Sequence, residues 1–234
     1  MDNSNLCRTV VSGLVATAMI WPVPISAQQL DTLCAGIRNS YECAQKIEEF
    51  QLRRYGDRVV RDSSRLVIRL EYGDSVILAD SVRDDWSSDR LYSYREYLAN
   101  IGYHVVEVQY VEGGAYLLVN TRTGEKQVVC GVPVPSPDGA RFVLTSVDLD
   151  AEYLPTTVQV WTVGEDGVQM EWRFDPLEVQ EGVFPYDELW GLTDAEWVSP
   201  TAIRLRRVYS TDRKSEVVLI ELKDDRWILR EPDA

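Results

Sequence analysis

From Arg58 onward, the sequence repeats a pattern of short apolar strands joined by tight polar turns. Two segments, Ser136–Phe142 and Ser199–Leu205, open equivalent units. Three strand pairs occupy the same later place in their units: Tyr116–Asn120 with Gln127–Val129, Val158–Trp161 with Gln169–Trp172, and Val218–Leu222 with Arg226–Leu229. Their spacing varies from roughly 35 to 60 residues, so the repetition is degenerate. A sheet of three or four strands repeated in this way is the blade of a β-propeller.

The repeats predict a mainly β fold in which antiparallel sheets are arranged as a small or incomplete β-propeller. The hairpin at Leu66–Ala79 fits as a shorter, earlier unit. The alternative is a β-sandwich built from ordinary hairpins. The polar and aromatic segment 82–100 interrupts the strands, and we expect it to be a loop that carries a short helix near Tyr94–Ala99.

One helix is predicted before the strands. Asn39 is suited to cap its first turn, and Glu42 follows three residues later, as in a capping box. Gly56 ends the pattern, which predicts a helix over residues 39–55. We therefore divide the chain into a signal peptide over residues 1–27, a helical segment over 28–57 and a β-repeat domain over 58–234.

Residues 1–27 have the layout of a cleavable secretory signal. Arg8 precedes the apolar stretch Thr9–Trp21. Pro22–Ala27 ends in small residues, of which Ala27 fits a peptidase site well at position −1, whereas Ile25 fits position −3 poorly. The stretch is shorter than the roughly 20 residues that a membrane span needs, and an uncleaved anchor is the alternative. No other segment of the sequence is long and apolar enough to cross a bilayer. We therefore expect a periplasmic or secreted protein with no membrane span after cleavage.

The cysteines and the charge agree with export. Export places thiols where disulfides persist. We expect Cys34 to bridge Cys43, with Cys43–Cys130 as the rival pairing, and Cys130 to be a buried, unreactive thiol. The formal net charge of −14 repels phosphate backbones and anionic lipid. We therefore expect no nucleic-acid partner.

Two resemblances to known families support this fold class. Ser136-Pro-Asp-Gly-Ala-Arg-Phe-Val143 resembles the start of a blade in TolB-type, WD40-like propeller repeats. Four stretches resemble a family of exported bacterial proteins of unknown function: Ser40–Glu48, Tyr110–Asn120 with Thr123 and Gly124, the Ser-Pro-Asp-Gly turn, and Val158–Trp161 followed by Glu196–Ser199. The resemblance covers most of the chain after residue 27 and implies a propeller-type fold and an exported location. It implies no activity, so no site residues carry over.

The sequence contains no catalytic motif that stands out. The single histidine, His104, lies at a strand start, and no Gly-x-Ser-x-Gly elbow accompanies it, so we expect a structural role. Asp148, Asp150 and Glu152 alternate, and in a strand this spacing would put three carboxylates on one face, where they could bind calcium. A solvated strand face or loop is the alternative, and we expect no other cofactor.

Trp190 lies in an acidic segment with Asp187 and Glu188, which we expect to be a loop. An aromatic ring among acids suits stacking on a sugar or anchoring a protein partner. These three residues are therefore the predicted partner or ligand surface. The expected function is an exported, soluble, non-enzymatic binding domain for an unknown protein or glycan of the cell envelope. The alternatives are a glycan-type hydrolase that uses acidic residues and an inhibitor of an envelope hydrolase.

Overall fold

The computed structural model describes residues 32–81, 89–151, 153–180, 189–211 and 215–230, so the predicted signal lies outside the described residues. Within these ranges the chain forms one long helix, α2 (Ser40–Tyr55), a short 3-10 helix, η2 (Glu178–Gln180), and four antiparallel sheets. The first sheet contains β1 (Val59–Asp62), β2 (Arg65–Arg69) and β3 (Ser75–Ala79), and the second contains β4 (Leu91–Leu98), β5 (Tyr103–Gln109), β6 (Gly114–Asn120) and β7 (Lys126–Val129). The third sheet contains β8 (Val134–Pro135), β9 (Arg141–Ser146), β10 (Thr157–Gly164) and β11 (Gly167–Phe174). The fourth sheet contains β12 (Trp190–Ser199), β13 (Ala202–Tyr209), β14 (Glu216–Lys223) and β15 (Arg226–Arg230).

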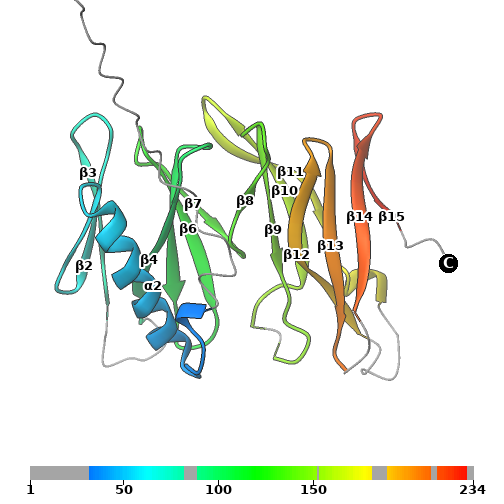
Figure 1. Ribbon diagram of the computed structural model, residues 1–234, viewed down its shortest axis with the longest axis horizontal. Helices are drawn as coiled ribbons and strands as arrows, with labels where there is room; N and C mark the ends of the chain where they lie inside the picture. The colour runs from blue at the N-terminus through cyan, green and yellow to red at the C-terminus, as the bar shows by residue number, and fades with distance from the viewer. Residues whose placement is uncertain (1–31, 82–88, 152, 181–188, 212–214, 231–234) are drawn as a thin grey trace, which may run out of the picture.

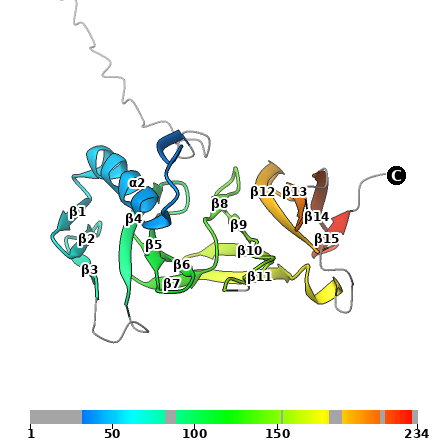
Figure 2. The same ribbon diagram turned by 90° about the horizontal axis from the view of Figure 1, so that it is seen from below.

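The four sheets form an open row. Strands that are neighbours in a sheet are also neighbours in the sequence. Figures 1 and 2 show the first and fourth sheets at opposite ends of the row. Among the described residues, three clusters of buried side chains each join two consecutive sheets, and none of these clusters joins the fourth sheet to the first. The fold is thus mainly β and has the form of an incomplete propeller, as predicted, and not the two sheets of a sandwich.

Alternate side chains of the inner sheets face opposite neighbours, because successive residues of a strand point to opposite faces. On β5, Val106 packs toward the first sheet, whereas Val105 packs toward the third. On β9, Leu144 packs toward the second sheet and Val143 toward the fourth. All four side chains are fully buried. Strands buried on both faces account for the continuous apolar runs in the sequence.

The outer face of the fourth sheet is covered by ion pairs that cross between its strands. Arg204 pairs with Glu196 at 2.6 Å, and Arg206 pairs with Asp194. On the opposite face of β13, Ile203 and Leu205 are buried. A charged outer face is what a terminal repeat needs in order to face water. The outer face of the fourth sheet is therefore suited to contact with water.

The repeated sequence units match the sheets. Each of the three strand pairs recognised in the sequence lies at the third and fourth strands of a four-stranded sheet: β6 with β7, β10 with β11, and β14 with β15. The Ser-Pro-Asp-Gly turn and its counterpart at Ser199 both join the first strand of a sheet to the second. The hairpin at Leu66–Ala79 is part of the smaller first sheet.

The Ser-Pro-Asp-Gly turn shows why its residues recur in such repeats. The buried Ser136 hydroxyl donates to Asp138 Oδ1 at 2.6 Å, and Asp138 Oδ1 also accepts from the Ala140 amide at 3.1 Å. Gly139 has φ +69°, and a Cβ there would lie 2.6 Å from the Asn100 carbonyl oxygen. The turn is therefore closed by its own side chains and fits tightly against the second sheet.

The helix predicted near Tyr94–Ala99 was wrong, because this segment belongs to β4, which pairs with β5. A register shift between Tyr94 and Glu96 inserts one extra residue. Across the extra residue, Tyr94 packs toward the first sheet and Leu98 toward the third, although regular alternation would put residues four apart on one face. The bulge therefore interrupts the two-residue period by which a strand is recognised in a sequence.

The two ends of the strands differ in the connections that they carry. In a meander, successive connections alternate between two faces of the row. One face, here called the tight-turn face, carries short turns such as 121–125, 136–140 and 164–167. The other, here called the long-loop face, carries the connections 80–90, 147–156 and 175–189. Long connections on a rigid scaffold are where binding residues are usually found.

In the described ranges, the first sheet has no strand at the innermost position, which β4, β8 and β12 take in the other sheets. The Glu71 amide donates to the Thr121 carbonyl at 2.9 Å, which places the β2–β3 turn beside the β6–β7 turn. By this correspondence, β1, β2 and β3 match the second, third and fourth strands of the other sheets. Helix α2 lies over β1 and β4 on this inner side (Figure 2).

Helix α2 has the predicted bounds and cap. Asn39 Oδ1 accepts hydrogen bonds from the amides of Tyr41 and Glu42 at 2.8 and 3.3 Å. The predicted disulfide is also confirmed: Cys34 bridges Cys43, with a Cα–Cα distance of 5.1 Å. It ties the segment before the helix to the first turn of the helix. In the described ranges, no helix has the length and apolar character of a membrane span.

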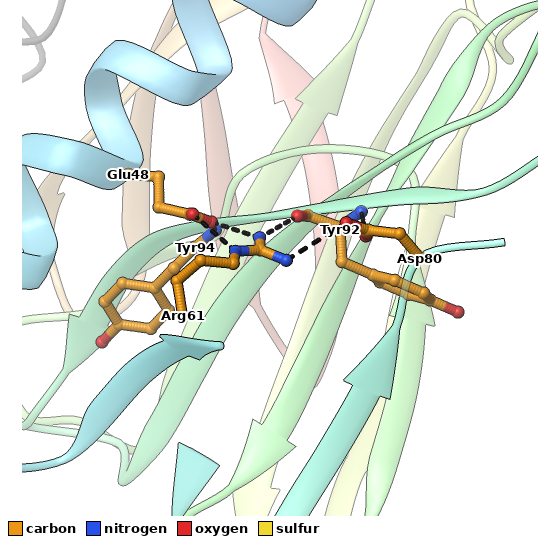
Figure 3. A network of polar contacts seen from close by, with 5 residues as sticks. All are labelled: Glu48, Arg61, Asp80, Tyr92 and Tyr94. Carbon is orange, nitrogen blue, oxygen red and sulfur yellow. Dashed lines mark hydrogen bonds and ion pairs between the residues drawn. The ribbon is translucent and has the colours of Figure 1, made fainter. Parts of the chain in front are cut away.

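A buried polar network joins α2 to the first two sheets (Figure 3). Glu48 binds the Arg61 guanidinium through both carboxylate oxygens, at 2.8 and 2.6 Å. The free edge of β4 is bonded to side chains: the Tyr94 amide donates to Glu48 at 2.7 Å, the Tyr92 amide donates to Asp80 at 2.9 Å, and Arg61 donates to the Tyr92 carbonyl. The network therefore satisfies an edge that another strand would otherwise pair with.

Candidate functional site

The long-loop face exposes aromatic and apolar side chains from two neighbouring connections. Tyr110 and Val111, in the β5–β6 turn, are 40% and 52% exposed, and Tyr153, in the β9–β10 loop, is 59% exposed. The connections lie together, since a Cβ at Gly113 would sit 3.3 Å from the Tyr153 Cβ. Exposed carboxylates from the same segments accompany them. We call this set the tyrosine surface: Tyr110, Val111, Glu112, Asp150 and Tyr153.

Asp148 organises the loop that presents Tyr153. Its carboxylate accepts hydrogen bonds from the amides of Ala151, Tyr153 and Leu154 at 3.0, 2.9 and 3.1 Å. The Asp148 amide also donates to the Thr156 hydroxyl oxygen at 2.9 Å, which closes the loop at its base. The sequence therefore forms a compact loop around a single aspartate.

Asp148 and Asp150 lie in a loop, which the sequence left open as the alternative to a strand, because β9 ends at Ser146. The short side chain of Asp148 competes with the strand by bonding the backbone of its own loop. Glu152 lies outside the described residues. Within the described ranges, no group of three His, Cys, Asp or Glu side chains is placed to hold a metal ion. Calcium binding at these residues stays a prediction.

Trp190 was expected in a loop, but it is the first residue of β12. Its amide donates to the Gln180 side-chain oxygen at 2.9 Å, and its carbonyl accepts from the Gln180 side-chain nitrogen at 3.0 Å. Its half-buried ring stacks near Phe174, with centroids 6.2 Å apart, and the Arg207 guanidinium lies 4.3 Å from its centroid. The ring therefore packs between the third and fourth sheets. Asp187 and Glu188 lie outside the described residues.

Two separately predicted sites occupy the same corner of the molecule. A Cβ at Gly191 would lie 2.8 Å from a methyl group of Val147 and 3.1 Å from a methyl group of Thr156. Because Val147 and Thr156 flank the Asp148 loop, the start of β12 at Trp190 lies against the base of that loop. The structure thus brings the Asp148 and Trp190 segments together on the long-loop face.

His104 is buried, as expected of a structural histidine. Its Nδ1 lies 2.9 Å from the Tyr94 hydroxyl, and its ring stacks on Tyr97 with centroids 4.9 Å apart. Burial, with a smaller contribution from Arg58, lowers the pKa of His104 from 6.5 to about 4. The neutral ring is therefore part of an aromatic cluster beneath α2.

Tyr110, Val111 and Tyr153 were not predicted from the sequence as site residues. A signal was present, because each lies in or beside a turn-forming segment, where a large apolar side chain is not needed for a core. Their proximity depends on the packing of the second sheet against the third, which no local pattern reveals.

No family model matches the chain, and no curated protein matches it. Among solved structures, the chain is similar to the crystal structure of a "putative 6-phosphogluconolactonase" from Bacteroides fragilis, with 8% identity and a TM-score of 0.37. The match covers 73% of this chain and 55% of that chain, so this chain spans just over half the length of that protein. The class that the strand order defines is an incomplete β-propeller, and membership of the TolB-type family stays a prediction.

Proposed function

We propose that this chain is an exported, non-enzymatic interaction domain that binds a basic segment of an envelope protein through the tyrosine surface. One observation carries the proposal: two touching connections expose Tyr110, Val111 and Tyr153 beside the carboxylates of Glu112 and Asp150. Tyrosine offers a large apolar area with a polar tip and is enriched at protein interfaces.

The charge of the whole chain favours a basic partner. A formal net charge of −14 attracts cationic segments over a distance and speeds their encounter. The carboxylates of Glu112 and Asp150 would then pair with lysine or arginine at the rim of the contact. Such rim pairs contribute more to association rate and specificity than to affinity.

The surface is also held in place before binding. The backbone of Tyr153 is fixed by its bond to Asp148, and the turn that carries Tyr110 packs against the same loop. A loop ordered in advance loses less conformational entropy when a partner binds. Export of the domain is supported by the signal-like residues 1–27 and by the Cys34–Cys43 disulfide.

A glycan-type hydrolase that uses Asp148 is the rival function. The three amide bonds to the Asp148 carboxylate suit the ordering of a loop better than proton transfer to a substrate. Glycan turnover that is lost in an Asp148→Asn variant would favour the hydrolase over the interaction domain.

Site-specific photocrosslinking tests the proposal. A benzophenone amino acid is placed at Tyr153 and, as a matched control, at Tyr72, which is 78% exposed in the β2–β3 turn of the tight-turn face. In envelope extract, we expect a discrete protein adduct from position 153 and none from position 72. The adduct should disappear at high salt and in a Glu112→Gln/Asp150→Asn variant, because both changes weaken the pairing of the rim carboxylates with basic side chains.

Two results would count against this function. Equal adducts from positions 153 and 72 would show that the labelling is nonspecific. An adduct that resists both salt and the double variant would show that the partner does not recognise the carboxylates.

A further inference from the structure

The tight-turn face holds a cavity of about 420 Å³, where turns of the first three sheets meet. It is lined by residues of four turns, which are 71–74, 99–102, 121–125 and 164–167, together with the strand ends beside them. Pockets for small ligands typically have volumes of roughly 300–1,000 Å³. The cavity lies opposite the tyrosine surface and is independent of it.

The cavity has an apolar floor and a charged rim. Ile101 and Tyr103 are 7% and 3% exposed and form the floor with the half-buried Val163. Among the rim residues are Glu71, Arg122 and Glu165, whose side chains are exposed. The rim therefore presents both signs of charge around an apolar surface.

The charged groups of the rim are not committed to one another. Across the described ranges, neither Arg122 nor Glu165 makes an ion pair or a side-chain hydrogen bond, although both line the same cavity. Among the described residues, the Glu71 carboxylate accepts only from the Thr121 hydroxyl, at 3.2 Å. By contrast, Arg61 and Arg141 are bound by carboxylates from other strands or from α2.

The backbone that carries these groups is held firmly. The Thr121 amide donates to the Gly102 carbonyl at 3.0 Å, and the Glu71 amide donates to the Thr121 carbonyl at 2.9 Å. Asn120 Oδ1 accepts from the amides of Arg122 and Thr123 at 2.9 and 3.0 Å. The turns at 71–74, 99–102 and 121–125 are therefore fixed relative to one another, and a ligand needs to order only the ends of their charged side chains.

We propose that this cavity binds a small zwitterion with an apolar side chain, such as a free amino acid or a dipeptide. Its ammonium group would pair with Glu71 and Glu165, its carboxylate with the fork of Arg122, and its side chain would cover Ile101 and Val163. A guanidinium group binds a carboxylate through two parallel hydrogen bonds, which makes Arg122 the natural partner for the anionic end. The ligand would thus supply the ion pairs that the rim does not make.

An NMR titration of the uniformly ¹⁵N-labelled protein with leucylglycine tests this site. We expect saturable shifts of the amide signals of residues 101–103 and 120–122, with a dissociation constant of about 1 mM or below. N-acetyl-leucylglycine, which lacks the ammonium group, and leucylglycine amide, which lacks the carboxylate, should each bind about tenfold more weakly.

Two variants assign the contacts, because exposed side chains can be replaced without unfolding the protein. Arg122→Gln should weaken the binding of leucylglycine about tenfold but leave the binding of leucylglycine amide unchanged. Glu165→Gln should weaken the binding of leucylglycine but not the binding of N-acetyl-leucylglycine. The matched control is Arg226→Gln, an exposed arginine of the fourth sheet, which should bind like the wild type. The proposal is overturned if these signals do not move at about 10 mM leucylglycine, or if the blocked dipeptides bind as well as the parent.

Discussion

The carboxylate of Glu48 on α2 binds the guanidinium of Arg61 on β1 through two hydrogen bonds, and it also accepts the Tyr94 amide of β4. One side chain therefore joins the helix to both of the sheets beneath it. The two charged side chains are only 11% and 20% exposed, so water contributes little to their solvation. This relationship makes Glu48 the residue that fixes α2 over the inner edge of β4.

Replacing Glu48 by alanine should destabilise the protein by about 3 kcal/mol, because a buried guanidinium and a strand amide both lose their partner. The matched control is Glu49→Ala on the same helix, which removes the exposed pair with Arg53. That change should cost under about 1 kcal/mol. Urea unfolding of both variants measures the difference, and similar losses in the two would show that the network does not stabilise the fold.

Stability should fall as the pH is lowered from about 6.5 to about 4, in part because of His104. The pKa of the His104 ring is lower in the folded state than in the unfolded chain. As the pH falls, the unfolded chain therefore binds a proton before the folded protein does, and the free energy of unfolding decreases. The contribution of the neutral His104 ring to the free energy of unfolding is complete above the pKa of the unfolded chain, and it amounts to about 3 kcal/mol at most. Chemical unfolding from pH 4 to 8 should give a shallower slope for His104→Gln than for wild type, whereas parallel curves would contradict the assignment.

Alkylation should distinguish the three cysteines that lie in the described part of the chain. Cys34 and Cys43 are bridged. Burial raises the pKa of the Cys130 thiol, which lowers its thiolate fraction at neutral pH. We expect iodoacetamide to modify Cys130 only after denaturant is added, as read by mass spectrometry. Rapid modification of the native protein would show that Cys130 is accessible.

Removal of the disulfide should lower the free energy of unfolding by about 2–3 kcal/mol, mainly because the unfolded chain gains conformational entropy. A Cys34→Ser/Cys43→Ser variant should therefore unfold at lower urea concentration and keep its circular dichroism spectrum. An unchanged midpoint would show that the bridge does not constrain the unfolded chain.

Replacement by alanine should destabilise the protein to different extents at two glycines that lie in turns. Gly139 and Gly73 both have positive φ, which costs a residue with a Cβ about 1–2 kcal/mol. At Gly139 the Cβ would also lie 2.6 Å from the Asn100 carbonyl oxygen, whereas at Gly73 no heavy atom of a neighbour lies within 4 Å. Gly139→Ala should consequently be the more destabilising change in thermal unfolding. Equal shifts in the melting temperature would show that the second and third sheets can move apart at this turn.

The parts of the fold that were predicted from sequence depend on local chemistry. Asn39 caps α2 with its own side chain, and Gly139 and Gly167 take positive φ in turns that join adjacent strands. These features need no knowledge of distant residues. The strand pairs around them were therefore recognised in the correct order.

Two of the errors lie in strands whose alternation a bulge disturbs. β4 has its register shift at Tyr94 and Glu96, and β12 has one between Thr193 and Glu196, where Asp194 takes φ +53°. In each case the extra residue interrupts the alternation of side chains between the two faces of the strand. The tyrosine surface and the cavity were missed for a different reason, because each is assembled from turns of separate sheets.

The open row has a consequence for how the protein reaches its fold. In a ring, the last interface to form must join the two most distant parts of the chain, and the entropy of closing that large loop is lost only then. Here, each of the three buried clusters forms between sheets that follow one another in sequence. Folding can spread from any pair of sheets to its neighbours, as in a linear array. The number of sheets is thus open to change, since a duplicated last unit would extend the molecule without having to be accommodated in a circle.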